Sequence, residues 1–330
     1  MKSFFVAVAV VLLGCLAVGK PASASQCTIV LPLDNSYVES GLVSLVLKCA
    51  QNSVDAVQVA VNGRKQAVAA KSFGRYYACY DGIHLSYGLN SIKVIGFKEG
   101  KKIDEVTVQV FYRSDISPGD SASPRSFRKY LFHTDENEKE CIPCHELNFS
   151  SADGRQEGPD RSPCYVCHKK ILADYRYVHG PAAVWSCLMC HDGKGRNPKL
   201  AVVTPVDTTC ANCHEKSWSG KKYEHGPTAA GNCTTCHNPH AADKAYFLRM
   251  SPADLCASCH EEILRRPHVI SSPIGNGSHP VRLSPDPFNP TKDFTCISCH
   301  NPHGSDSSVF LNAYEDSMSM HHFCQTCHKM

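Results

Sequence analysis

Eight copies of the pattern C-x-x-C-H carry most of the reactive side chains of this 330-residue chain. Two thiols at this spacing can form thioethers with the vinyl groups of a porphyrin, and the histidine that follows can bind its iron. We number these motifs 1 to 8 in chain order and expect each to attach one c-type haem. The predicted thioether residues are Cys141, Cys144, Cys164, Cys167, Cys187, Cys190, Cys210, Cys213, Cys233, Cys236, Cys256, Cys259, Cys296, Cys299, Cys324 and Cys327. The predicted proximal iron ligands are His145, His168, His191, His214, His237, His260, His300 and His328.

Zinc is the main alternative occupant, because C-x-x-C pairs also build zinc ribbons. Such ribbons do not require a histidine directly after every pair, whereas every pair in this chain has one. Disulfides within the motifs are disfavoured because a bond across C-x-x-C is strained. The motifs therefore favour haem over zinc and over a disulfide framework.

The spacing of the motifs reveals an internal repeat. Motifs 1 to 6 start 23 residues apart, and His133, His179 and His225 each precede a motif by eight residues. The repeating unit is thus a histidine followed by two motifs. The four units are 133–178, 179–224, 225–278 and 279–328.

The sixth ligand of each iron separates electron carriers from enzymes. A haem closed by two histidines mainly transfers electrons, while an open face can bind substrate. Eight haems need eight distal ligands, and His321 and His322 are expected to supply one between them. The candidates are His133, His179, His225, His240, His268, His279, His303, His321 and His322.

His240 and His303 follow the proximal histidines of motifs 5 and 7 by three residues. A side chain so close along the chain cannot reach the opposite face of the same porphyrin, so each is expected to bind a neighbouring haem. Units one and two have Asn148 and Lys194 at this position and hold only one free histidine each. Either ligands cross between units, or one or two early haems use lysine, use His84 or stay open.

Residues 27–113 follow a different pattern, with short β-branched runs that alternate in polarity between turn signals such as Asn62-Gly63. This pattern predicts an antiparallel β-sandwich. Its cysteines are Cys27, Cys49 and Cys79, and Cys49–Cys79 is the first choice for a disulfide, although sequence alone leaves the connectivity open. Residues 114–126 are rich in Ser, Pro, Gly and Asp and are predicted to be a linker.

The N-terminus has the features of an export signal. Lys2 precedes an apolar run over 4–18, and Ala22-Ser23-Ala24 matches a cleavage site, which predicts a signal peptide over 1–24. The alternative is a lipoprotein signal with Cys15 as the acylated residue, and membrane attachment is expected only in that case. The formal net charge of +3 gives no reason to expect nucleic-acid binding.

Residues 127–330 are predicted to form an octahaem cytochrome c domain. With 204 residues for eight haems, the chain can build only a thin core of its own, so the haems must supply most of the apolar interior. The fold class is therefore an N-terminal all-β sandwich followed by a haem-packed, coil-rich region with short helices. Equal tethers between motifs favour a roughly linear row of haems, and the "HGP" sequences at 179–181 and 225–227 are expected to end the short helices before them.

Residues 225–328 resemble the doubled C-x-x-C-H family of multihaem cytochromes c, with H-x-P, then C-x-x-C-H-x-P-H, then a second C-x-x-C-H. The resemblance is weaker over 133–224. It implies an octahaem protein of the cytochrome c3-like or extracellular electron-transfer type. In addition, Leu85–Val94 resembles the L-x-x-G-x-N-x-I-x-V signature of bacterial immunoglobulin-like domains, which implies a docking or spacer module.

These observations favour an exported electron carrier over a substrate-converting enzyme. We expect electron transfer along closely spaced bis-histidine haems in anaerobic respiration or extracellular electron transfer. The expected location is the periplasm, the outer cell surface or the extracellular space. The expected partners are other cytochromes c, extracellular metal acceptors, or further copies of the chain in a filament. The alternative is an octahaem reductase acting on nitrite, hydroxylamine or tetrathionate through one open or Lys-ligated haem, although no C-x-x-C-K is present.

Overall fold

The structure is a computed structural model. It describes residues 25–66, 70–73, 77–114, 116, 122–139, 141–143, 145–147, 149, 158–194, 199–202, 204–265, 279, 281–282, 285–286, 289–312, 319–325 and 327–328. The predicted signal peptide with Cys15, much of the predicted linker, the thioether residue Cys144 and the candidate distal ligand His268 lie outside these residues.

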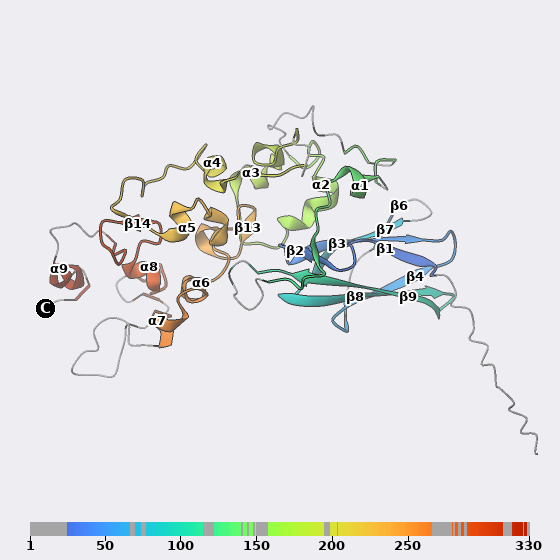
Figure 1. Ribbon diagram of the computed structural model, residues 1–330, viewed down its shortest axis with the longest axis horizontal. Coiled ribbons are helices and arrows are strands. Elements are labelled where there is room, and N and C mark those ends of the chain that lie inside the picture. Colours follow the sequence, from blue (N-terminus) through green and yellow to red (C-terminus); the bar gives the residue numbers. More distant parts are fainter. Residues whose placement is uncertain are drawn as a thin grey trace, which may run out of the picture.

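The N-terminal part consists of two layered β-sheets (Figure 1). The four-stranded sheet has the order β1-β3-β7-β6, with β1 Cys27–Leu31, β3 Leu42–Cys49, β7 Tyr77–His84 and β6 Ala70–Phe73. The second sheet has the order β10-β2-β9-β8-β4-β5, with β10 Arg128–Lys129, β2 Ser36–Val38, β9 Lys101–Tyr112, β8 Gly88–Lys98, β4 Ala56–Val61 and β5 Arg64–Lys65.

Alternating side chains build the core between these sheets. Leu45 and Leu47 of β3 are completely buried, as are Ile92 of β8 and Val110 of β9. Since successive residues of a strand face opposite sides, the residues between them point away from this core. The sequence prediction of an N-terminal β region is therefore confirmed at the level of its sheets. The short strands β2, β5 and β6 were not predicted, and the pairing of β2 with β9 is parallel, whereas the prediction was an antiparallel sandwich.

The disulfide prediction Cys49–Cys79 is wrong, because Cys49 is bonded to Cys27. β1 and β3 are antiparallel neighbours, and their register places Cys27 directly opposite Cys49 with the Cα atoms 4.0 Å apart. Cys79 lies on β7 opposite Val46, three residues from Cys49 along β3. Register, which the sequence does not reveal, decides the pairing.

The segment after the predicted linker returns to the sheet. β10, which the sequence analysis assigns to the haem region, pairs in parallel with β2, and the ring of Phe127 packs edge-on against Phe111. The first repeat unit also contacts the four-stranded sheet, where the Lys170 side chain approaches Gly82 of β7. The two parts of the chain are therefore packed against each other.

Beyond residue 130 the described chain is mostly coil with short elements, as predicted. Its α-helices are α1 Asp135–Glu138, α2 Tyr165–His168, α3 Gly180–Ala183, α4 Val206–Cys210, α5 Gly226–Ala229, α6 Pro252–Ala257, α7 Glu261–Arg265, α8 Cys296–Cys299 and α9 Met320–Gln325. The 3-10 turns are η2 Lys169–Ile171, η3 Cys187–Met189, η4 Cys233–Thr235 and η5 Ala245–Phe247. From α2 to α9 these elements follow one another broadly in chain order, away from the sheets and along the long axis (Figure 1). Among the described residues, no helix has the length and apolar character needed to cross a membrane.

The two "HGP" sequences begin helices, contrary to the expectation that they end them. His179 and His225 are extended N-cap residues, and the proline of each sequence lies in the first turn of α3 or α5. Proline fits there because the first N–H groups of a helix have no partner within the helix. The histidine side chain is thus held at the start of a short rigid turn.

Candidate haem-binding site

Six motif histidines each face a second histidine in the part of the chain that the structure describes. The six ring pairs have centroid separations between 5.8 and 6.2 Å. They are His168 with His133, His191 with His240, His214 with His179, His237 with His303, His260 with His225, and His328 with His279.

This spacing fits an iron bound between two imidazoles. A metal held at about 2.0 Å by one nitrogen of each ring separates the ring centres by roughly 6 Å. The interplanar angle is only 5° for His191 and His240 and 17° for His237 and His303. Direct stacking of two rings would bring the centroids closer, so the centroid separations match the width of a metal and its bonds. The tightest pair is His279 with His328, whose Nε2 atoms lie 3.5 Å apart.

The partners follow a regular rule. The histidine that opens a unit faces the second motif of the same unit, as His179 faces His214 and His225 faces His260. The histidine of the x-P-H element faces the first motif of the preceding unit, so His240 lies opposite His191. Of the alternatives left open by the sequence, the structure therefore shows candidate ligands crossing between units.

Two short β-ladders produce this crossing. β11 (Tyr177–Val178) pairs with β13 (Ala241–Ala242), and the His179 amide donates a hydrogen bond of 3.0 Å to the His240 carbonyl. β12 (Tyr223–Glu224) pairs with β14 (Gly304–Ser305), and a bond of 3.1 Å joins His225 to His303 in the same way. One ladder thereby delivers the facing histidines for both motifs of a unit.

A second set of hydrogen bonds orients the motif histidines 3, 5 and 7. The Nδ1 atom of each donates a bond of 2.7 Å to the carbonyl nine residues later, at Leu200, Tyr246 and Val309 respectively. A carbonyl can only accept, so Nδ1 carries the proton and Nε2 keeps a lone pair for a metal. Bridge contacts two residues further on, such as His237 with Leu248, close the same loop. Sequence reasoning missed these hydrogen bonds, although the accepting residue lies nine positions after the motif histidine in all three cases.

Burial keeps several facing histidines in the neutral form that binds metal. It lowers the pKa of His240 to about 4, with a further contribution from the nearby His191. Burial is also the main cause of the lowered pKa of His225 and His303. Each of these rings can therefore offer a nitrogen lone pair at neutral pH.

Successive motifs touch through their cysteines. The first cysteines of motifs 2 and 3, Cys164 and Cys187, are direct neighbours, as are Cys256 and Cys296 of motifs 6 and 7. One cavity of about 3000 Å³ is lined by cysteines and histidines of motifs 1 to 7 and by His279. It also reaches strands β1 and β3 of the neighbouring sheet, through residues such as Val46. A continuous, mostly apolar space thus runs along the motifs where porphyrins need to lie.

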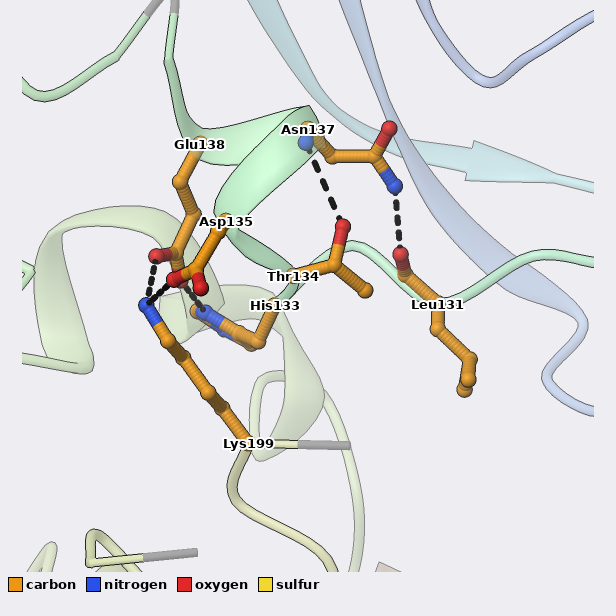
Figure 2. A network of polar contacts seen from close by, with 7 residues as sticks. All are labelled: Leu131, His133, Thr134, Asp135, Asn137, Glu138 and Lys199. Atoms are coloured by element: carbon orange, nitrogen blue, oxygen red, sulfur yellow. Dashed lines mark hydrogen bonds and ion pairs between the residues drawn. The ribbon is translucent and has the colours of Figure 1, made fainter. Parts of the chain in front are cut away.

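The first unit contains a buried acidic network that the sequence analysis missed (Figure 2). Glu138 of α1 is fully buried; its Oε1 atom lies 2.9 Å from Nδ1 of His133, and its Oε2 atom lies 2.6 Å from the Lys199 ammonium. Lys199 also pairs with Asp135 at 2.8 Å. Thr134 caps the helix by accepting the Asn137 amide, which fixes Glu138 relative to His133.

The remaining candidates are placed as follows. His145 and His300 line the same cavity as the six paired motif histidines. His321 and His322 lie in α9, where they contact Gln325 and Ser319. His84 is an exposed residue at the end of β7. No group of three or more His, Cys, Asp or Glu side chains within the described ranges converges as a zinc site requires.

Comparison with protein families supports the haem interpretation. The family described as "Doubled CXXCH motif" matches residues 179–217, 225–264 and 289–330, which contain motifs 3 to 8. Paired motifs of this kind indicate binding of c-type haem, as in a multihaem cytochrome c. No curated protein is matched.

Solved structures resemble only a small part of the chain. An endo-beta-1,4-mannanase double mutant from Cellulomonas fimi is 15% identical with a TM-score of 0.20; the match covers 26% of this chain and 17% of that one. An engineered protein is 17% identical with a TM-score of 0.23, over 26% and 19% of the two chains. CopC from Methylosinus trichosporium OB3b is 15% identical with a TM-score of 0.20, over 24% and 83%. The chain thus spans less than a fifth of the first two proteins, and similarity at this level carries no functional argument.

Proposed function

We propose that this protein is an octahaem cytochrome c that transfers electrons along a row of bis-histidine haems. The observation that carries the proposal is the set of six facing histidine pairs at metal-compatible distance. Iron closed on both faces by imidazole has no site for substrate, so electron transfer is the chemistry left to it. In each case the motif residues would hold the haem covalently and the facing histidine would complete its coordination.

Contact between successive motifs supports transfer from motif 2 to motif 5 and from motif 6 to motif 8. Electron transfer slows steeply with distance, so haems attached to touching cysteine pairs are well placed to exchange electrons. Thiol contacts join motifs 2 and 3, motifs 4 and 5, and motifs 6 and 7. Cys190 is close to Cys213, and Cys299 is close to Cys327, which links motif 3 to motif 4 and motif 7 to motif 8.

The N-terminal sheets are proposed to be an immunoglobulin-like module. The order β1-β3-β7-β6 corresponds to strands A-B-E-D of that fold, and β9-β8-β4 corresponds to G-F-C. In this interpretation β2, which follows β1 along the chain, is a short strand that pairs in parallel with β9 in the other sheet. The module covers one end of the haem row and offers its exposed surface to partners.

We propose export to the periplasm or cell surface, because the predicted signal over 1–24 and covalent haem attachment suit that compartment. Electron exchange with other cytochromes c or extracellular metal acceptors would then be the physiological role, in anaerobic respiration. The linear order of the motifs is compatible with end-to-end association into filaments.

The test is a count of haems and of their spin states. The purified holoprotein is expected to give eight haem equivalents in a pyridine haemochrome assay, with predominantly low-spin signals in electron paramagnetic resonance. A count far below eight, or zinc in place of iron, would contradict the proposal. Electron microscopy of the same sample separates filaments from single molecules.

An octahaem reductase remains the second candidate, and one observation favours it. The crossing rule gives motif 1 a partner at the position of His240 in the second unit, and that position holds Lys194. The Gly193 backbone beside it packs against Phe149, just after motif 1. Cyanide or nitric oxide binding by one ferric or ferrous haem supports the reductase, whereas absence of binding supports pure electron transfer.

A further inference from the structure

The only distal-ligand candidate hydrogen-bonded to a carboxylate among the described residues is His133. Its Nδ1 atom contacts Glu138, which has no exposed surface, while the His225 ring bonds to the backbone carbonyl of Pro302. The residues five positions after His179 and His225 are Val184 and Ala230, where His133 has Glu138. The acidic partner is therefore a specific feature of the first unit.

We propose that Glu138 is a positioning residue that lowers the reduction potential of the haem held between His168 and His133. A carboxylate that accepts the Nδ1 proton makes the imidazole a stronger electron donor at Nε2. A stronger donor stabilises ferric iron more than ferrous iron, which lowers the potential. The inference rests on the proposed haem occupancy of motif 2.

Lys199 and Asp135 moderate this effect. Both oxygens of Glu138 act as acceptors, one from His133 and one from the Lys199 ammonium. The side chain of Lys199 is 24% exposed and is shared with Asp135, which is 87% exposed. Loss of Asp135 would leave Lys199 bound to Glu138 alone. The stronger ion pair would make the carboxylate a weaker hydrogen-bond acceptor for the Nδ1 proton of His133.

The position of this haem in the row determines the direction of electron flow that a low potential would favour. Motif 2 lies next to the sheets, since Lys170, the second residue after it, approaches Gly82. A low potential there would make electron flow from the sheet end toward α9 favourable. The first unit would thus be the entry point of the row.

The experiment compares three variants of the full-length holoprotein by redox titration followed by optical and paramagnetic resonance spectra. E138Q keeps the shape and loses the charge, and one haem's share of the titration is expected to move to higher potential. D135N is expected to move the same share in the same direction by less. E136Q is the matched control, because Glu136 is on the same helix, is 81% exposed and pairs with Lys139; it is expected to change nothing.

The resonance spectrum provides a readout that a purely structural role would not move. The low-spin signal of the affected haem is expected to change its g-values in E138Q, while the other signals stay in place. An E138Q curve that overlays the wild-type curve with eight haems retained would overturn the inference. If E138Q loses a haem, the test rests on D135N, which alters only an exposed side chain. A D135N titration curve that does not shift then rejects the inference. A low haem count in the wild type instead contradicts the proposed function itself.

Discussion

A histidine that closes a haem iron has to present one nitrogen lone pair and hold its ring plane at the same time. Motif histidines 3, 5 and 7 achieve both through one backbone carbonyl, because the 2.7 Å bond fixes tautomer and orientation together. In each case the carbonyl belongs to a loop that contains a residue with a positive φ value. These residues are Leu200, Tyr246 and Phe310 for motifs 3, 5 and 7 respectively. This uncommon backbone conformation is needed to turn the carbonyl toward the ring.

His240→Ala is expected to open one iron in the preceding unit. Because His240 faces His191, the haem of motif 3 should lose its sixth ligand, while the haem of motif 5, which directly precedes His240, should keep His303. The measurement is the appearance of one high-spin ferric signal and of carbon monoxide binding to one ferrous haem.

His84→Ala is the control for this prediction, because His84 is exposed on β7. The double variant H191A/H240A should affect the same single haem as H240A. Two affected haems in the double variant would contradict the assignment of His240 to motif 3.

Cys49→Ser is expected to lower the free energy of unfolding of the β region by about 3 kcal/mol, the usual effect of removing a disulfide that closes a loop of this size. The bond joins Cys27 and Cys49, which are 22 residues apart. Chemical denaturation followed by tryptic mapping without reductant checks both points. Cys79→Ser is the matched control, and a peptide linking Cys49 to Cys79 in the wild type would refute the pairing.

At the scale of elements, two very short β-ladders position most of the histidines that cross between units. The ladders β11–β13 and β12–β14 have two residues in each strand, yet each positions the facing histidines of two motifs. A porphyrin bound in the adjacent cavity would fill the space beside these short strands, as further strands do in a sheet. A displacement of one ladder should therefore disturb two haems together.

Gly304→Val tests this dependence. A Cβ atom at Gly304 would lie 3.1 Å from the Tyr223 carbonyl and 3.2 Å from the Trp218 Cβ atom, so a branched side chain has to push β14 away from β12. Both His303 and His225 would move, and two haems are expected to lose low-spin character in the resonance spectrum. Gly304→Ala adds only that Cβ atom, which the other ladder accommodates at the equivalent Ala241, so it is the control and is expected to disturb the two haems less than Gly304→Val. Disturbance of a single haem in G304V would argue against a shared ladder.

The limits of sequence reasoning are clearest at this scale. Alternating runs over 42–50 and 91–100 predicted the strands β3 and β8, because polarity alternation is a local signal, although β8 begins three residues earlier, at Gly88. The ladder between Val178 and Ala241 has no such signal, since two residues cannot show a period. The sequence likewise identified the ligand types by motif, but which histidine meets which motif depends on contacts across whole units.

Glu138 illustrates the same limit for a single residue. In the sequence it stands in an acidic run with Asp135 and Glu136, and such runs are usually solvated. Only the fold shows that one member is buried against His133 while Glu136 stays exposed. The helical period of α1 turns the two side chains in different directions.

At the scale of the whole molecule, the two halves differ in what holds them together. The sheets share a cluster of buried side chains that includes Leu45, Tyr80, Ile83 and Val94. In the haem region many of the described apolar residues line a large cavity. The porphyrins would provide the missing contacts, so haem and fold are coupled there.

Expression without haem attachment is expected to leave the sheets folded and the rest unfolded. Limited proteolysis should leave a resistant fragment close to residues 25–130, because β10 belongs to the second sheet, and circular dichroism should retain the strand signal and lose the helical one. The holoprotein digested in parallel is the control. A protease-resistant haem region in the apoprotein would show that its chain packs without the cofactor.

The exchange of histidines between neighbouring units has a temporal side. A chain is synthesised from its N-terminus, so motif 3 becomes available for haem attachment before His240 exists to cap it. Each such iron would spend part of its maturation with one face exposed to solvent and small molecules, until the following unit arrives. Each of these haems would then gain its sixth ligand only after the next unit has been made. A chain truncated between two units would always end with one haem that lacks this ligand.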